Sequence, residues 1–146
     1  METKQAAVDS GIVRAARDAL LSDERVAVAY LFGSFALGSA GPKSDLGIAV
    51  LLNVPIEKRL GGPLDELRDA VEHSYRRPCD LIDARSAPAD LVHRILRDGV
   101  LLVERDRSPR IAFEVAKRNG YFDLLPYLRE YRWAREATRD WREGAD

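Results

Sequence analysis

The sequence predicts a mixed α/β domain in which a small sheet is backed by helices and followed by a helical C-terminal extension. Short apolar runs rich in β-branched and aromatic residues alternate with longer segments of helical periodicity. The first two of these runs are separated by about a dozen residues, which is short for the helical crossover that joins parallel strands. We therefore expect an antiparallel or mixed sheet rather than an all-parallel one.

The first part of the chain is predicted to form a helix, a strand, a short connection and a second strand. Apolar residues recur at near-helical spacing across 4–21, and VAVAYLF (26–32) is a buried strand that ends at Gly33-Ser34. The glycine- and proline-containing stretch 35–43 predicts a loop or one short helical turn. The run 45–53 then predicts the second buried strand.

The remaining elements follow from the same signals. We expect helices over 64–76 and 87–98, strands over 79–84 and 100–105, and a mainly helical chain from Ser108 onward. Pro88 lies near the start of the second helix and Gly99 follows its end, which is the usual placement of these residues. Asn119-Gly120 indicates an end to the helix that precedes it.

Length and composition limit the class of protein. A chain of 146 residues suits one domain, which we divide into a core over 1–107 and a helical extension of the same domain over 108–146. The net charge of −1 argues against direct binding to nucleic acid. The single cysteine, Cys79, excludes a disulfide framework and favours a reducing cytoplasm, and the apolar runs are too short to span a bilayer.

Four positions suggest chemistry on a nucleotide. A Gly-Ser pair such as Gly33-Ser34, between a strand and a helical turn, can offer backbone N–H groups to phosphates. Asp45 opens the second predicted strand and Asp80 lies on the third, so the two carboxylates could share a divalent ion. A second carboxylate two residues after Asp45 would face the same side, but that position is Gly47.

Neighbouring residues are given other roles. Lys43, beside Asp45, is a candidate contact to a phosphate, although its usual role would be that of a loop residue. Asp83 is expected to point away from Asp80 by strand alternation, and Cys79 is expected to be a small buried core residue.

The spacing Gly-Ser-x10-Asp-x-Gly resembles the Gly-Ser-x10-Asp-x-Asp signature of the DNA polymerase β-type nucleotidyltransferase superfamily. The chain resembles its smallest branch, the minimal nucleotidyltransferase (MNT) antitoxins. The stretches AYLFGSFALGSAGPKSDLGIAVLL, CDLIDARSAPADLVHRILRDGVLLVERD and YFDLLPYL carry the resemblance, which covers about residues 25–130. It implies a polymerase β-like core in which a small mixed sheet is packed with helices.

The resemblance also implies a function and roles for individual residues. Gly33 and Ser34 would hold nucleotide phosphates, Asp45 would bind magnesium, and Asp80 would bind the catalytic ion and help to activate the acceptor hydroxyl. MNT antitoxins are paired with a HEPN-domain RNase toxin, which such an antitoxin blocks by transferring AMP from ATP onto a toxin tyrosine. The expected assembly is therefore a hetero-oligomer of antitoxin and toxin.

Three departures from the pattern leave three hypotheses open. Gly47 replaces the second motif carboxylate, Leu37 stands where the family usually has an arginine, and Phe35 stands where a basic residue is common. Gly47 and Leu37 favour an antitoxin with weak or absent catalysis that neutralises its toxin by binding. The alternatives are an active magnesium-dependent nucleotidyltransferase that modifies the toxin, and an enzyme acting on a small molecule such as an aminoglycoside. The third would need a further substrate domain, for which this chain has no room.

The terminal segment carries many charged residues and several aromatic ones, including Trp133 and Trp141. Such a pattern usually indicates a solvated, ion-paired helix face. A helix that docks onto a protein partner is the second interpretation, because tryptophan and arginine are enriched at interfaces. RNA binding by the same arginines ranks third.

Overall fold

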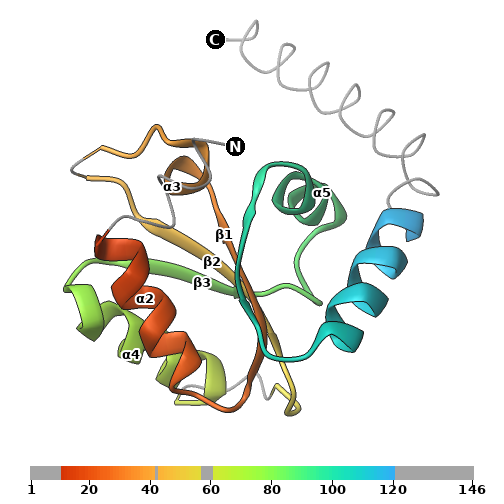
Figure 1. Cartoon of the computed structure of the whole chain (residues 1–146), viewed down its shortest axis with the longest axis horizontal. Coiled ribbons are helices and arrows are strands. Elements are labelled where there is room, and N and C mark those ends of the chain that lie inside the picture. The colour runs from red at the N-terminus through yellow and green to blue at the C-terminus, as the bar shows by residue number, and fades with distance from the viewer. Residues whose placement is uncertain (1–10, 42, 57–60, 121–146) are drawn as a thin grey trace, which may run out of the picture.

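The computed structural model describes residues 11–41, 43–56 and 61–120 (Figure 1). Its elements follow in chain order: α2 (Gly11–Leu21), β1 (Val26–Phe32), α3 (Ser34–Leu37), β2 (Leu46–Leu52), α4 (Pro63–Tyr75), β3 (Cys79–Asp83), α5 (Ala89–Asp98) and β4 (Val100–Glu104). A further helix, which we call helix 107–120, follows β4. The described strands therefore lie within a residue or so of the ranges that the sequence predicted.

The described strands form one mixed sheet in the order β3-β2-β1-β4. β1 runs antiparallel to β2 and to β4, while β2 and β3 are parallel. The short connection through α3 can only turn the chain back, whereas the connection through α4 is long enough to return β3 in the same direction as β2. The prediction of a mixed sheet is confirmed.

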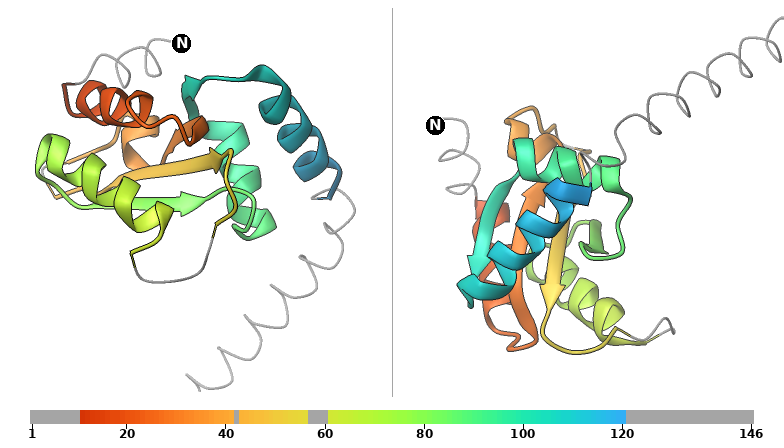
Figure 2. Two further views of the ribbon diagram at one scale, coloured as in Figure 1. Left: turned by 90° about the horizontal axis from the view of Figure 1, so that it is seen from below. Right: turned by 90° about the vertical axis from the view of Figure 1, so that its right-hand side faces the viewer.

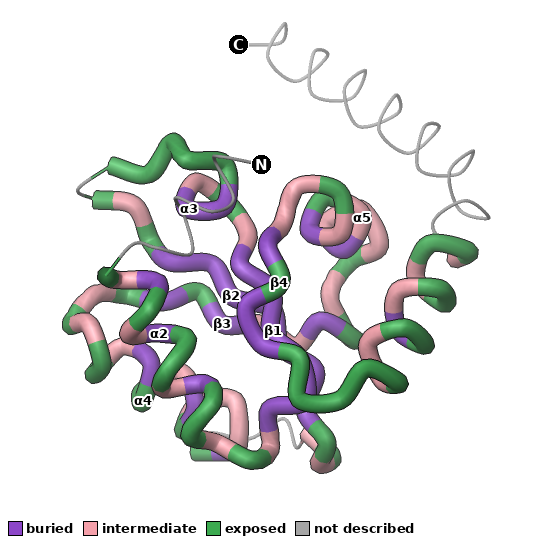
Figure 3. Tube along the Cα trace, viewed as in Figure 1, coloured by how far each residue is buried: buried purple, intermediate pink, exposed green. Residues whose placement is uncertain are grey.

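Helices cover both faces of the sheet (Figures 1 and 2). α2 and α4 pack on one face, where Val13, Leu20, Leu67 and Val71 form a single apolar cluster with strand residues. α5 and helix 107–120 pack on the other face through Val92, Ile95 and Phe113. All seven residues of β2 are buried, as expected for a central strand covered on both sides (Figure 3).

Helix 107–120 is attached to the sheet by an aromatic and a polar contact. The ring of Phe113 lies 6.2 Å from that of Tyr30, centroid to centroid. The Tyr30 hydroxyl donates a hydrogen bond of 2.9 Å to Glu114 Oε1. These contacts join the first part of the predicted extension to the core.

Some of the predicted segments fall partly or wholly outside the residues that the structure describes. Of the first predicted helix, residues 11–21 are helical as α2, and residues 4–10 lie outside. Helix 107–120 includes Asn119 and Gly120, where the sequence had indicated an end to the helix, and it reaches the last described residue. The segment with Trp133 and Trp141 is outside as well. Among the described residues, no helix combines the length and apolar character needed to cross a bilayer.

Candidate functional site

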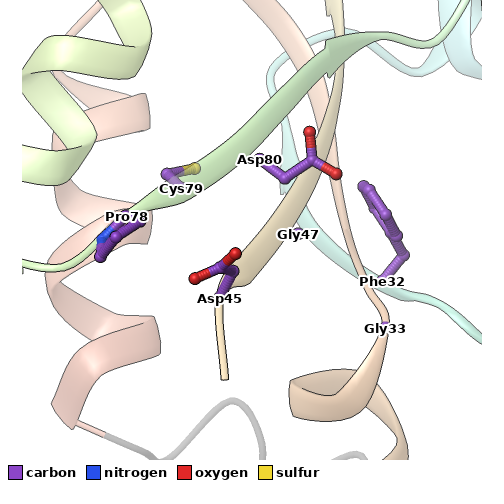
Figure 4. Close-up of a pocket in the computed structure, with 7 residues that line it drawn as sticks. All are labelled: Phe32, Gly33, Asp45, Gly47, Pro78, Cys79 and Asp80. Carbon is purple, nitrogen blue, oxygen red and sulfur yellow. The ribbon is translucent and has the colours of Figure 1, made fainter. Parts of the chain in front are cut away.

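A pocket of about 430 Å³ lies at the edge of the sheet where β1 ends and where β2 and β3 begin (Figure 4). Its walls come from these three strands and their flanking residues: Phe32, Gly33, Asp45, Gly47, Pro78, Cys79 and Asp80. The pocket thus brings together three of the residues singled out from the sequence, Gly33, Asp45 and Asp80, although they are up to 47 positions apart (80 − 33).

The turn from β1 into α3 depends on Gly33. Its backbone has φ 80° and ψ −154°, a conformation that residues with a side chain rarely adopt. The N–H groups of Ala36 and Leu37 both donate to the Gly33 carbonyl at 3.1 Å, which closes the single turn of α3. Apart from Gly33 itself and its two chain neighbours, no residue has a heavy atom within 4 Å of the place where a Cβ would be, so a ligand can approach the backbone here.

The predicted phosphate contacts Ser34 and Lys43 do not line this pocket. Ser34 is the half-buried first residue of α3, directly after Gly33, and Lys43 is exposed in the connection to β2. Their roles toward a nucleotide remain predictions. Leu37 is 57% exposed and also lies outside the lining.

The parallel pairing of β2 and β3 places the two carboxylates on the same side. Gly47 lies opposite Asp80 in this pairing, and Asp45 is two residues before Gly47. Because side chains alternate along a strand, Asp45, position 47 and Asp80 face the same layer. Both carboxylates are exposed and border the pocket in Figure 4.

Phe32 and Gly47 form a cross-strand pair beside the two carboxylates, with Gly47 between Asp80 on β3 and Phe32 on β1. They are partners in the antiparallel pairing of β1 and β2. A Cβ on Gly47 would lie 2.9 Å from both the Cε2 atom and the carbonyl oxygen of Phe32. The Phe32 ring, half-buried, thus occupies space that any side chain at position 47 would need.

Sequence reasoning missed this role of Phe32. The signal was available in principle, because a glycine inside a buried strand marks a close approach by a neighbouring group. What the sequence lacked was the register that makes Phe32 that neighbour.

The side chains available as metal ligands determine which kind of metal site the pocket could form. Within the described ranges, no group of three or more His, Cys, Asp and Glu residues is placed to hold a metal ion. Two carboxylates match a magnesium ion that arrives with nucleotide phosphates and keeps several waters, because magnesium often has only one or two protein carboxylates as ligands. They do not match a cage of three carboxylates. Asp45 and Asp80 would be the residues that hold such an ion.

Cys79, which also lines the pocket, is not a reactive group. Cys79 is buried, as predicted, and burial raises the pKa of its thiol to about 12, so the thiol stays protonated at neutral pH. Its N–H donates to Glu72 Oε1 at 2.9 Å, and the Tyr75 hydroxyl donates to the Pro78 carbonyl at 3.1 Å. These bonds tie the start of β3 to α4.

Asp83 is not part of the pocket, in agreement with strand alternation. Its carboxylate accepts hydrogen bonds from the N–H of Arg85, at 3.2 Å, and from the Ser86 hydroxyl. It therefore stabilises the turn that follows β3.

Comparisons with known proteins give one family. The family model described as polymerase beta nucleotidyltransferase matches residues 16–108. A chain from the crystal structure of a toxin–antitoxin with AMP-PNP superposes with a TM-score of 0.67 at 25% identity, covering 79% of this chain and 94% of that one. No match was found among curated proteins.

Two other solved structures share the fold. One is the complex of a tri-AMPylated HEPN toxin from Shewanella oneidensis with its MNT antitoxin, with a TM-score of 0.60 at 23% identity and coverage of 88% and 94%. The other is the toxin–antitoxin MntA–HepT, with a TM-score of 0.60 at 23% identity and coverage of 87% and 94%.

Proposed function

This chain belongs to the polymerase beta nucleotidyltransferase family, and on that premise we propose that it is an MNT-type antitoxin that neutralises a HEPN-domain RNase toxin. We infer neutralisation by binding, with catalysis weak or absent. The partner is suggested by similar structures described as a toxin–antitoxin and as an MNT antitoxin with a HEPN toxin. A hetero-oligomer in the cytoplasm, where ATP is abundant and Cys79 stays reduced, is the expected state.

The pair of Phe32 and Gly47 is the observation that carries this proposal. Loss of one of about three carboxylates weakens a magnesium site, because the ion relies on few protein ligands and near-ideal geometry. Here Phe32 also occupies the space that a side chain at position 47 would need, since a Cβ on Gly47 would lie 2.9 Å from Phe32 atoms. A carboxylate therefore cannot be accommodated at position 47 without movement of Phe32.

The pocket still supports binding of a nucleotide. Gly33 leaves its backbone open to a ligand, and Asp45 and Asp80 border the same pocket. A related toxin–antitoxin was crystallised with AMP-PNP, an ATP analogue. ATP is thus the expected ligand, and Asp45 and Asp80 would hold a magnesium ion that stabilises charge on its phosphates.

The retained carboxylates favour a second candidate function, transfer of AMP from ATP to a toxin tyrosine. In that reaction the tyrosine oxygen bonds to the α-phosphorus, pyrophosphate leaves, and the hydroxyl proton goes to a base. Asp80 lines the pocket and would act on the hydroxyl, and a HEPN toxin in a similar structure is described as tri-AMPylated.

One experiment separates the two functions. Purified toxin is incubated with α-labelled ATP, magnesium and either the wild-type chain, Asp45→Asn or the double variant Phe32→Ala/Gly47→Asp, and both labelling and RNase activity are measured. Neutralisation by binding predicts that wild type and Asp45→Asn both silence the toxin in a stable complex without label.

Two outcomes would decide against it. If wild type labels the toxin and Asp45→Asn does not, the chain is an active nucleotidyltransferase. If wild type neither labels nor binds the toxin, the antitoxin assignment is wrong. Label with the double variant alone would mean that positions 32 and 47 have shut down a working site.

A further inference from the structure

Arg77, two residues before β3, reaches the connection between α3 and β2. Its Nη2 donates to the carbonyl of Ser44 at 3.1 Å and to that of Gly41 at 3.4 Å. Its Cζ lies 5.9 Å from the centroid of the Phe35 ring. One half-buried guanidinium therefore touches the first turn of α3 and the residue that precedes Asp45.

Gly41 and Ser44, whose carbonyls accept hydrogen bonds from Arg77, are also hydrogen-bonded to each other. The N–H of Gly41 donates to Ser44 Oγ at 2.8 Å, and the N–H of Ser44 donates to the Gly41 carbonyl at 3.1 Å. These bonds hold Gly41 and Ser44 together but do not attach them to β3. Arg77 supplies that attachment, beside the bond of 3.3 Å from the Leu46 N–H to the Pro78 carbonyl.

The chemistry of the contact suits arginine. Its planar guanidinium can donate to two carbonyls while its face lies over an aromatic ring. A lysine ammonium is a compact, strongly hydrated charge on a flexible stem, so it would not reproduce this arrangement. The three contacts thus fix one orientation of the side chain.

We propose that Arg77 is a positioning residue of the nucleotide pocket. It connects the first turn of α3, which follows Gly33, and the backbone before Asp45 to the strand that carries Asp80. The inference rests on the proposed nucleotide pocket and names a residue on which its geometry depends. Because Gly33 and the carboxylates would meet the phosphates and the metal, Arg77 acts on affinity for the triphosphate rather than for the nucleoside part.

Binding of ATP with magnesium, and of AMP, is measured by calorimetry on the full chain for wild type, Arg77→Ala and Arg77→Lys. The matched control is Arg76→Asn, which removes the same charge one residue away. Arg76 has φ 58°, a left-handed conformation that asparagine tolerates. Thermal melting checks that each variant is folded.

Arg77→Ala is expected to weaken ATP binding about tenfold, as for loss of a charged hydrogen-bond donor, while AMP binding changes less than twofold. Lysine is expected to restore little, and Arg76→Asn to behave like wild type. Amide hydrogen exchange at Ser44 and Asp45 is expected to be faster in Arg77→Ala only.

Three results would overturn the inference. Equal ATP affinity in wild type and Arg77→Ala would exclude the positioning role. An equal loss of affinity for ATP and for AMP, together with a lower melting temperature, would also exclude it. A wild-type chain that binds toxin but not ATP would also overturn it, while leaving the antitoxin proposal standing. If the wild-type chain fails to bind toxin, the antitoxin proposal itself is wrong.

Discussion

Phe32 and Gly47 face each other across β1 and β2, and the aromatic ring of Phe32 covers the glycine. A Cβ at position 47 would lie 2.9 Å from Phe32 Cε2, 3.1 Å from Cδ2 and 2.9 Å from the Phe32 carbonyl oxygen. Real Cβ atoms essentially never come as close as 2.9 Å to another heavy atom. The two residues therefore have to be treated as one unit when the site is altered.

Gly47→Asp alone is expected to destabilise the protein rather than restore a site. Overpacking of this kind costs about 1–3 kcal/mol in the free energy of unfolding. Adding Phe32→Ala removes the ring contacts, so the double variant should recover part of the loss despite the cavity that alanine leaves. Urea denaturation of both single variants and the double variant measures the coupling. Additive effects would show that the ring and position 47 do not interact.

Magnesium is expected to strengthen ATP binding through Asp45 and Asp80. Asp45→Asn and Asp80→Asn should each reduce the gain in ATP affinity that magnesium causes, with a loss of about tenfold, because each replaces a charged ligand by a neutral one. Titration calorimetry with and without magnesium measures that gain. Asp83→Asn is the matched control, since Asp83 is on the same strand but outside the pocket. An equal effect of Asp83→Asn would contradict a role specific to the pocket.

The Cys79 thiol is expected to react slowly with alkylating agents in the native protein. Burial raises its pKa from the ordinary value of 9.0 to about 12, so almost no thiolate forms at pH 8. The folded state holds this proton more tightly than the unfolded chain. The stabilisation is therefore complete below pH 9 and is lost as pH rises toward 12. Iodoacetamide labelling from pH 7 to 10, native and in urea, tests this; rapid native labelling at pH 8 would contradict it.

Tyr30→Phe is expected to loosen helix 107–120 from the sheet. It removes the hydroxyl that donates to Glu114 Oε1 at 2.9 Å and leaves the ring in contact with Phe113. One such bond to a charged acceptor is worth about 1.5–3 kcal/mol in the free energy of unfolding. Burial and this bond raise the pKa of Tyr30, so the hydroxyl remains a donor throughout the neutral range.

Hydrogen exchange read out along the chain distinguishes local from global effects of Tyr30→Phe. Faster exchange confined to residues 107–120 would mean that the extension can detach by itself. Faster exchange through the strands as well would mean that core and extension unfold together. That result is expected if the two form a single domain, as the sequence predicts. Unchanged exchange at every position would contradict a structural role for the bond.

Local sequence signals were sufficient for the elements and for the expectation that Asp45 and Asp80 lie close together. The strands at 26–32 and 46–52 are apolar and β-rich, and their short connection requires a reversal of chain direction. Asp45 and Asp80 could be paired in advance because they lie on the second and third predicted strands, which could be neighbours in the sheet. The mixed sheet and the common pocket of Gly33, Asp45 and Asp80 agree with those expectations.

The sequence by itself determined that Gly47 lacks a carboxylate, but only the tertiary structure decided what takes its place. Periodicity specifies which face a residue lies on, whereas the register between strands specifies its neighbour. That register brings Phe32 onto Gly47. The contact of Arg77 with Ser44 likewise joins residues 33 positions apart, through a connection whose path no local pattern specifies. Side chains that are distant in sequence thus shape the pocket whose backbone the local patterns predict.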